Sequence, residues 1–199
     1  MVDQTKEVKK WDEVRETIKD MDRLLLGTYF SQIKTDPRRV LFALSHYKFA
    51  AKMIGAGKTV LEVGCNDGTG TLFLAESAKK VVAVDIDEKA IREAKDNFES
   101  DRVEFRNLNF LDARIGTFDA VVSMDVVEHI YPENEAGYFQ SVYDNLTDHG
   151  LCIIGTPNKT SEQYASEASR IGHVNLFTWD RFQAALELSL IQISEPTRP

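Results

Sequence analysis

Three side chains that can bind a metal or transfer a proton stand close together in the middle of the chain. Asp125, Glu128 and His129 directly follow the apolar run 118–124. If Asp125 begins a helical turn, spacings of three and four residues place all three side chains on one helix face. Two carboxylates and an imidazole can hold Mg²⁺ or a transition metal, with His173 as a candidate fourth ligand. The competing interpretation gives these residues helix-capping and ligand-lining roles without a metal.

His129 is also the best candidate for a general base. An imidazole titrates near neutral pH, so it can take the proton from a hydroxyl group that becomes a nucleophile. Its position after an apolar run would put it at the carboxyl-terminal edge of a parallel sheet, where ligands bind. The alternative is a histidine that bonds to the backbone and only holds a loop in place.

A glycine-rich turn predicts a ligand that approaches the backbone closely. The apolar run 60–63 leads into Gly64-Cys-Asn-Asp-Gly-Thr-Gly70, and a helical pattern follows. A second apolar run, 81–84, ends at Asp85, which lies 85 − 62 = 23 residues after Glu62. A carboxylate at the tip of this second strand can accept hydrogen bonds from both hydroxyls of a ribose.

Two phosphate-binding motifs are excluded by their spacing. Gly57-Lys-Thr59 resembles the end of a P-loop, but the first glycine of that motif would be Lys52, and the segment precedes its strand. The dinucleotide pattern G-x-G-x-x-G fails because Asn66 and Thr69 occupy its second and third glycine positions, counted from Gly64. Glu62, inside the apolar run before this turn, also suits a ligand with a positive amino group, because its negative charge would repel a pyrophosphate.

Composition and charge narrow the classes of function. A length of 199 residues allows one domain with a substantial core, and 43% hydrophobic with 28% charged residues is ordinary for a soluble protein. No run approaches the roughly 18 apolar residues of a membrane span, and the polar beginning lacks a signal core, which predicts a cytoplasmic protein. The net charge of −8 disfavours a nucleic-acid partner.

The elements that must position these residues alternate between strands and helices. We expect strands at 59–63, 81–84, 103–105, 118–124 and 151–155, and helices at 71–78, 88–98, 133–146 and 179–187. The strands are short continuous apolar runs, which is typical of strands buried on both faces. This order predicts an α/β fold with a doubly wound, mostly parallel sheet.

Two further helices are predicted before the sheet. Residues 7–26 carry apolar side chains at helical spacing, namely Val8, Trp11, Val14, Ile18, Met21 and Leu25. A second helix begins at Pro37, a residue suited to a first helical turn, and ends before Gly55. We expect residues 1–54 to form a helical lid beside a ligand-binding domain at 55–187.

The combined motifs resemble those of class I S-adenosylmethionine-dependent methyltransferases, and within this class they are most similar to the branch that contains the ubiquinone-biosynthesis O-methyltransferases. The resemblance covers about residues 60–186 and rests on Glu62-Val-Gly-Cys-Asn-Asp-Gly68, Asp85, Phe118-Asp-Ala-Val-Val122, Val127-Glu-His-Ile130, Gly155-Thr-Pro-Asn158 and Gly172-His-Val-Asn-Leu-Phe177. It implies a Rossmann-like sheet of strand order 3-2-1-4-5, with the family's last two strands missing or partial here.

The resemblance also implies a role for each matching residue. The methionine part would contact Glu62, Gly64, Cys65 and Gly68. The ribose would contact Asp85, and the adenine would contact Ile86, Asn109 and Phe110. At the end of the fourth strand, Met124 would offer its backbone carbonyl near the amino group of the cofactor, and Asp125 would also contact the cofactor. Asn66 replaces the usual middle glycine of the loop, and asparagine tolerates the left-handed backbone that this turn requires.

We therefore expect S-adenosylmethionine-dependent methyl transfer to a small-molecule acceptor, an oxygen of a catechol-like ring or of a sugar. Similar acid-x-x-Glu-His arrangements occur in ubiquinone-biosynthesis O-methyltransferases and in small-RNA 2′-O-methyltransferases, where Mg²⁺ or another divalent metal would lower the pKa of vicinal hydroxyls. Methylation of an RNA 2′-hydroxyl is one alternative, which the net charge disfavours. A nicotinamide-dependent oxidoreductase is the poorest alternative.

The last segment breaks the pattern of the rest. Residues 188–199 lose the helical spacing and have the character of a non-native tail, to be left out of fold reasoning. The competing interpretation is one last strand, at 190–193, followed by a disordered end. If the tail is foreign and the natural chain continues differently, a third alternative is a truncated, non-catalytic cofactor-binding remnant.

Overall fold

The computed structural model describes residues 37–188. The predicted helix at 7–26, most of the expected lid and most of the expected tail therefore lie outside the described residues. Among the helices between residues 37 and 188, none combines the length and the apolar character needed to cross a bilayer.

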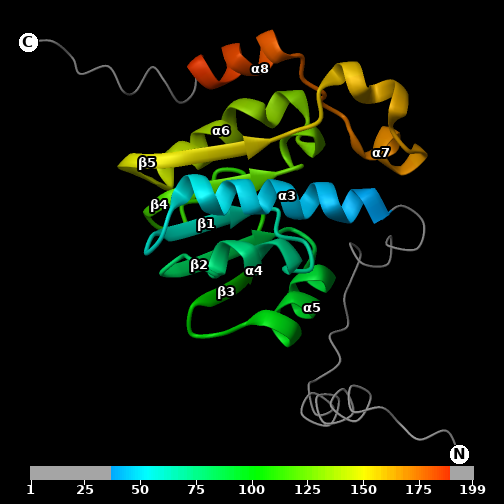
Figure 1. Cartoon of the computed structure of the whole chain (residues 1–199). Coiled ribbons are helices and arrows are strands. Elements are labelled where there is room, and N and C mark those ends of the chain that lie inside the picture. The colour runs from blue at the N-terminus through cyan, green and yellow to red at the C-terminus, as the bar shows by residue number, and fades with distance from the viewer. Residues whose placement is uncertain (1–36, 189–199) are drawn as a thin grey trace, which may run out of the picture.

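A five-stranded parallel sheet forms the centre of the described chain (Figure 1). Its strands are β1 (Thr59–Val63), β2 (Lys80–Asp85), β3 (Val103–Asn107), β4 (Phe118–Met124) and β5 (Leu146–Gly155). They lie in the order β3-β2-β1-β4-β5, and every neighbouring pair is parallel. This confirms the predicted doubly wound sheet and its strand order.

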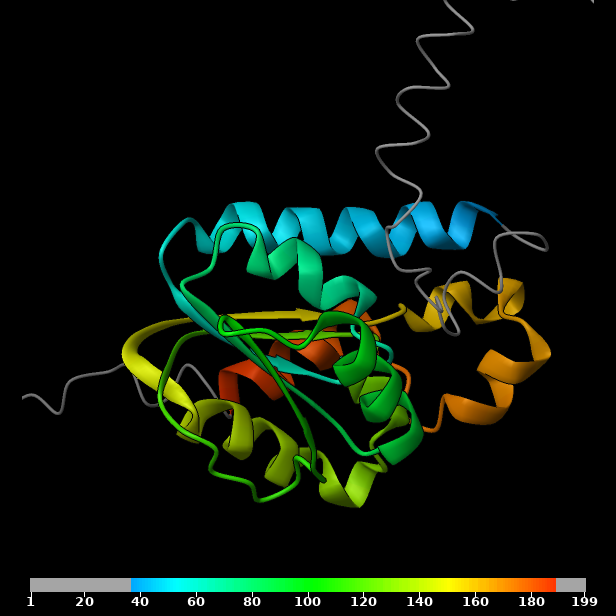
Figure 2. The same cartoon turned by 90° about the horizontal axis from the view of Figure 1, so that it is seen from below.

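Helices cover both faces of this sheet (Figure 2). On one face, α3 (Pro37–Ile54), α4 (Thr69–Ala75) and α5 (Glu88–Phe98) pack against side chains such as Val60 and Ala83. On the other face, α6 (Glu135–Asp144) and α8 (Trp179–Leu186) pack with the alternate side chains, including Leu61 and Val84. Successive strand residues point to opposite faces, so the continuous apolar runs supply both cores at once.

Four short helical segments follow β4 and β5 at the carboxyl-terminal edge of the sheet. The 3-10 turn η2 (Val127–His129) follows β4, and η3 (Pro132–Asn134) leads into α6. After β5, η4 (Lys159–Tyr164) and α7 (Glu167–Gly172) lead to α8, whose first turn is capped by the Thr178 hydroxyl, which accepts from the Arg181 amide. Within residues 37–188 no strand follows β5, and the strand considered at 190–193 lies outside the described residues.

The structure corrects several boundaries. The first helix after the glycine loop is α4, which begins at Thr69 and ends at Ala75 rather than spanning 71–78. The helix expected at 133–146 is divided into η3 and the shorter α6. The strand expected at 151–155 begins earlier, at Leu146, because Leu146 already pairs with Phe118 and an irregularity absorbs the extra residues before Leu151.

Asn145 connects the end of α6 to the segment before β4 by hydrogen bonds of its side chain, and to β4 by its own carbonyl, which accepts from the Phe118 amide. Its buried side-chain oxygen accepts from the Ile115 and Gly116 amides, at 2.7 and 3.1 Å. Its side-chain nitrogen donates to the carbonyls of Ala113 and Ser141, at 2.7 and 2.8 Å. One amide side chain thus satisfies four backbone groups that have little access to water.

Replacing Asn145 with alanine should lower the free energy of unfolding by about 3 kcal/mol, because buried backbone groups lose their partners. Urea unfolding measured without ligand checks this. Asn134→Ala is the matched control, since that exposed side chain makes no capping hydrogen bond, and it should change stability little. Equal stability of the two variants would contradict the role given to Asn145.

Candidate functional site

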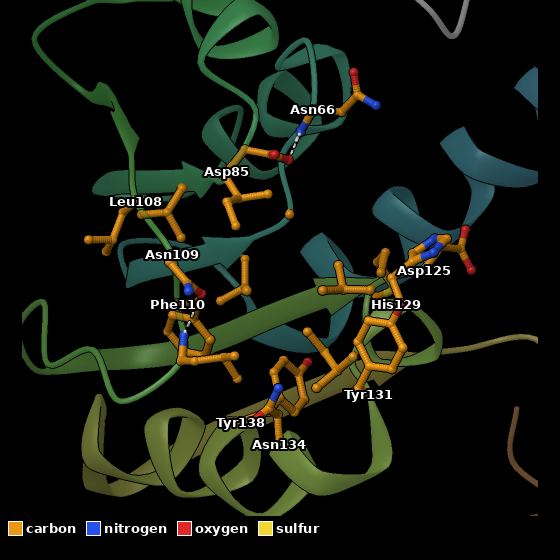
Figure 3. Close-up of a pocket in the computed structure, with 18 residues that line it drawn as sticks. Asn66, Asp85, Leu108, Asn109, Phe110, Asp125, His129, Tyr131, Asn134 and Tyr138 are labelled. Atoms are coloured by element: carbon orange, nitrogen blue, oxygen red, sulfur yellow. Dashed lines mark hydrogen bonds between the residues drawn. The ribbon is translucent and has the colours of Figure 1, made fainter. Parts of the chain in front are cut away.

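A pocket of about 480 Å³ opens at the carboxyl-terminal edge of the sheet (Figure 3). The ends of β1, β2 and β4, the loop after β3 and the segment between β4 and α6 form its walls. Nine of the residues expected at the site line it, namely Gly64, Asn66, Asp85, Ile86, Asn109, Phe110, Met124, Asp125 and His129. Half of the eighteen lining residues are therefore ones that the sequence analysis singled out.

The other expected residues lie behind or beside the pocket. Glu62 is buried in β1, and Cys65 and Gly68 are buried within the glycine loop. None of these three residues lines the pocket. Burial also raises the pKa of the Cys65 thiol, so that side chain stays neutral. Glu128 is buried beneath the edge, and His173 lines a second, neighbouring pocket of about 410 Å³.

The backbone of the glycine loop forms the floor at the end of β1. Gly64 has a φ of 77°, and a side chain there would collide with Val126, which packs directly over it. Asn66 has a φ of 49°, so the left-handed conformation expected for the residue that replaces glycine is confirmed. The missing side chain at Gly64 thus makes room for Val126, while the Gly64 backbone itself lines the pocket.

Asp85 is held in a fixed orientation at the tip of β2. One carboxylate oxygen accepts from the Asn66 amide at 2.8 Å, and the other accepts from the Asp87 amide at 2.9 Å. Each oxygen keeps a further lone pair, and the side chain lines the pocket. The carboxylate can therefore accept two hydroxyl groups from a ligand without first being reoriented.

The loop after β3 provides the opposite wall. The Asn109 side-chain oxygen accepts from the Leu111 amide at 3.1 Å, which leaves its side-chain nitrogen as a donor toward the pocket. Phe110 packs edge-to-face on Tyr138, with ring centroids 6.0 Å apart. A flat, hydrophobic wall with a fixed amide suits a planar heteroaromatic ring.

Nine lining residues were missed by the sequence analysis, and three of these are polar or aromatic. Tyr131 and Asn134 lie between β4 and α6, Tyr138 lies in α6, and together they close the lower side of the pocket (Figure 3). The Tyr138 hydroxyl donates to the Ser123 hydroxyl at 2.7 Å inside the core. An aromatic residue on an amphipathic helix normally indicates packing, so the sequence carried no signal that this one also borders a cavity.

Glu62 is a buried acid with unusual electrostatics. Its side chain is 1% exposed, and neither carboxylate oxygen has a hydrogen-bond partner. Burial raises its pKa to about 7, although the nearby Thr71 and Tyr47 hydroxyls lower it in part. The Tyr47 ring from α3 lies directly on Gly70, so it closes off this acid from the outside. A positively charged group nearby would favour the ionised form.

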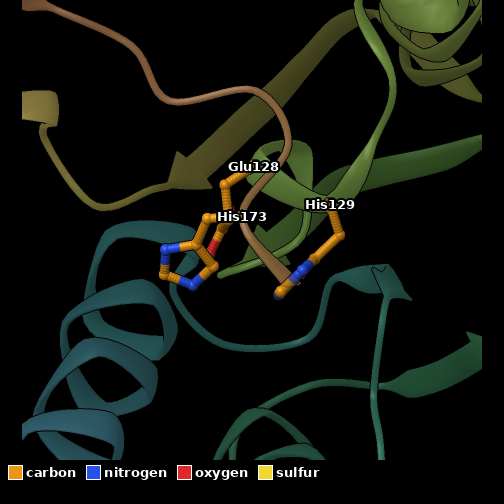
Figure 4. A group of neighbouring side chains, drawn as sticks. All are labelled: Glu128, His129 and His173. Carbon is orange, nitrogen blue, oxygen red and sulfur yellow. The ribbon is translucent and has the colours of Figure 1, made fainter. Parts of the chain in front are cut away.

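A second group of polar side chains lies beside the pocket. One ligand atom from each of Glu128, His129 and His173 lies within 4.8 Å of the other two (Figure 4). Asp125 is not part of this group. The expected helical turn begins at Val127 instead, and Asp125 itself has a left-handed φ of 55°, so spacings of three and four residues do not align the side chains.

Backbone contacts fix the His129 ring. Its Nδ1 lies 2.8 Å from the Gly172 carbonyl oxygen, which can only accept, so Nδ1 carries the proton and Nε2 keeps its lone pair. The His173 ring packs edge-on, with centroids 5.2 Å apart. Burial and the neighbouring His129 lower the pKa of His173. The expectation that His129 bonds to backbone and the expectation that it offers a basic nitrogen are therefore compatible.

Glu128 connects the end of β4 to the loop before α8. Its carbonyl accepts from the Val174 and Asn175 amides, at 2.9 and 3.0 Å. The Thr156 hydroxyl donates to one carboxylate oxygen at 3.0 Å, and the other oxygen is buried without a partner. Burial raises the pKa of this carboxyl to about 7. The two histidines thus come together because Glu128 holds the loop that carries His173.

Comparisons with known proteins agree with this geometry. Residues 60–150 match a family model described as a methyltransferase domain. A probable S-adenosylmethionine-dependent methyltransferase of Mycobacterium tuberculosis is 32% identical over 51% of this chain and 36% of its own length. The mitochondrial ubiquinone biosynthesis O-methyltransferase of Schizosaccharomyces pombe is 28% identical over 67% of this chain and 53% of its own length.

A solved structure shows the same fold. The N-methyltransferase NodS from Bradyrhizobium japonicum WM9, in complex with S-adenosyl-L-homocysteine, superposes with a TM-score of 0.59. It is 20% identical and covers 79% of each chain. The described chain therefore carries the class I methyltransferase fold. It spans between about a third and about half of the length of the two curated relatives.

The buried Glu62 should make stability depend on pH. Its folded pKa of about 7 exceeds the ordinary value of 4.5, so the folded state keeps a proton that the unfolded state loses in this window. The resulting stabilisation is complete below pH 4.5 and is lost as the pH rises toward 7, by at most about 3 kcal/mol.

Glu62→Gln, which cannot titrate, should remove this loss and be more stable than the original chain at pH 8 but not at pH 4.5. Urea unfolding between these pH values measures the difference. The exposed Glu76→Gln is the matched control and should follow the original pH curve. Parallel curves for Glu62→Gln and the original chain would show that Glu62 does not titrate in this range.

Proposed function

We propose that this chain binds S-adenosylmethionine and transfers its methyl group to a hydroxyl oxygen of a small molecule. The observation that carries the proposal is the preset Asp85 carboxylate, which faces a pocket with bare backbone at Gly64. The match of residues 60–150 to a methyltransferase domain supports it. The Schizosaccharomyces pombe relative is named an O-methyltransferase and the solved structure an N-methyltransferase, so the oxygen acceptor rests on His129 and not on similarity.

The residues present suit this cofactor in each of its parts. Asp85 would accept the two ribose hydroxyls, and the Asn109 amide and Phe110 would hold the adenine. Ile86, which is largely exposed on the pocket rim, would cover the ring from the other side. Glu62 would balance the positive amino group through the glycine loop, consistent with its unpartnered carboxylate. When bound, the cofactor supplies an electrophilic sulfonium methyl group.

On the acceptor side, this chain would align and deprotonate the attacking oxygen. His129 lines the pocket at the end of β4, and its Nε2 is the nitrogen left free to accept a proton. Tyr131 and Asn134 border the same end of the pocket and would contact the acceptor. Alignment and desolvation supply much of the rate in a displacement of this kind, and a positioned base adds to it.

Asp85→Ala should weaken binding of S-adenosylhomocysteine by about 100-fold, because two charge-assisted hydrogen bonds to the ribose are lost. Isothermal titration calorimetry on the whole chain measures this. Asp85→Asn tests the charge alone, and Asp96→Ala, at an exposed position of α5, is the control. Undiminished binding by a folded Asp85→Ala chain would refute the proposed cofactor site.

His129→Ala should lower kcat by about 100-fold, and the loss should shrink as the pH rises, because the acceptor hydroxyl then ionises in solution. Release of S-adenosylhomocysteine with a panel of catechols and monosaccharides measures this, with the exposed His149→Ala as the control. Tight cofactor binding without turnover of any acceptor would instead favour the non-catalytic remnant. Turnover of an RNA 2′-hydroxyl alone would favour the RNA alternative.

A second candidate role is metal binding by Glu128, His129 and His173. Their ligand atoms lie close enough to share one ion, and one Glu128 oxygen is buried without a partner. The hydrogen bond from His129 Nδ1 to a backbone carbonyl is the usual outer contact of a metal-binding imidazole. Two imidazoles and one carboxylate suit Mn²⁺, Fe²⁺ or Zn²⁺ better than Mg²⁺, which prefers oxygen ligands.

Titration of the whole chain with Mn²⁺ tests this role directly. We expect saturable binding that Glu128→Gln and His173→Ala each weaken by about tenfold or more, since each variant removes or neutralises one ligand. His149→Ala should bind as the original chain does. Absence of saturable Mn²⁺ or Zn²⁺ binding by the original chain would leave His129 as a base acting without a metal.

A further inference from the structure

Four large apolar side chains on α3 are exposed. Leu41, Phe42, Phe49 and Met53 are 65%, 62%, 58% and 55% exposed, respectively. All four belong to a single helix, on the outside of the described chain (Figures 1 and 2). We call these four residues the outer face of α3.

The outer face lies opposite the side of α3 that packs on the domain. Phe42, Phe49 and Met53 are separated by seven and four residues, so a period of 3.6 residues brings them to one side. Tyr47, which is buried in the core, lies five residues after Phe42 and so about 140° away around the helix. The helix thus carries exposed apolar side chains on a side that residues 37–188 do not cover.

Exposed large apolar side chains gathered on one helix of a domain usually mark a place where something else packs. A covering element is therefore expected over α3.

Residues 7–26 have the properties that such an element needs. Their apolar positions, from Val8 through Trp11, Val14, Ile18 and Met21 to Leu25, follow helical spacing. A helix of these 20 residues would be about 30 Å long, close to the roughly 27 Å of the 18-residue α3. The connection, residues 27–36, is long enough to reverse the chain direction, and it joins α3 directly at Pro37.

We infer that residues 7–26 form an amphipathic helix that docks antiparallel on the outer face of α3. This docking is independent of the proposed methyl transfer. It places Trp11 against the apolar side chains of α3 and turns the charged residues of the segment toward water. It also supports α3 from behind, where the Tyr47 ring on the other side packs on the glycine loop.

Trp11 is a direct reporter of this docking. The chain has two tryptophans, and Trp179 is exposed, so Trp179→Phe leaves Trp11 as the single emitter. In the whole Trp179→Phe chain without ligand, Trp11 emission should be blue-shifted and poorly quenched by acrylamide. Phe42→Lys with Phe49→Lys should shift the emission to the red and restore quenching. Tyr164→Lys, at a position that is 82% exposed elsewhere, is the matched control and should change neither.

Circular dichroism and sedimentation velocity complete the test. The doubly substituted chain should keep its cooperative unfolding, because both lysines replace exposed side chains. Red-shifted, freely quenched Trp11 emission in the Trp179→Phe chain would overturn the proposal. So would a blue shift that depends on protein concentration and accompanies dimer formation, because the occupant of the outer face would then be a second copy.

Discussion

Burial of the sheet on both faces is the constraint on which the rest of this structure depends. Parallel strands such as β1 and β4 are covered by helices on either side, so their side chains are apolar except where a strand ends. Polar groups are therefore confined to the two edges where loops begin. At the carboxyl-terminal edge, β2 ends at Asp85, and the segments after β3 and β4 carry Asn109 and His129. The sheet alone brings these three residues to one pocket.

Two buried carboxyls stand out against this rule. Glu62 lies inside β1, and Glu128 lies beneath the end of β4, and each has an oxygen without a partner and a pKa raised to about 7. Burying such groups costs stability unless something compensates. Both acids border the pocket region from behind, at the glycine loop and at the histidine pair. A positive charge brought by a ligand would offset the loss of stability that burying each carboxyl causes. Buried carboxyls with a raised pKa often mark functional sites.

The sequence predicted the strands and helices of the fold and the residues at the ends of the strands. The strand order followed from the resemblance to class I methyltransferases. The left-handed Asn66 and the Asp85 position follow from apolar runs and loop chemistry, which act locally along the chain. The sequence analysis failed where distant segments meet. Asp125 was placed with Glu128 by helical spacing, but a backbone reversal at Asp125 breaks that spacing. Tyr138 was missed because its role depends on which element faces α6, and spacing does not encode this.

The site divides into two halves with different origins. The half proposed to hold the cofactor is formed by β1, β2 and the loop after β3, where the conformation of each residue follows from the strand before it. The other half, around His129 and His173, depends on Glu128 holding the loop before α8 through its backbone carbonyl. Changes in that loop would alter the acceptor side without disturbing Asp85. This separation explains how proteins that share the fold can be named for methylation of different atoms, and why the acceptor has to be inferred from His129 and its neighbours.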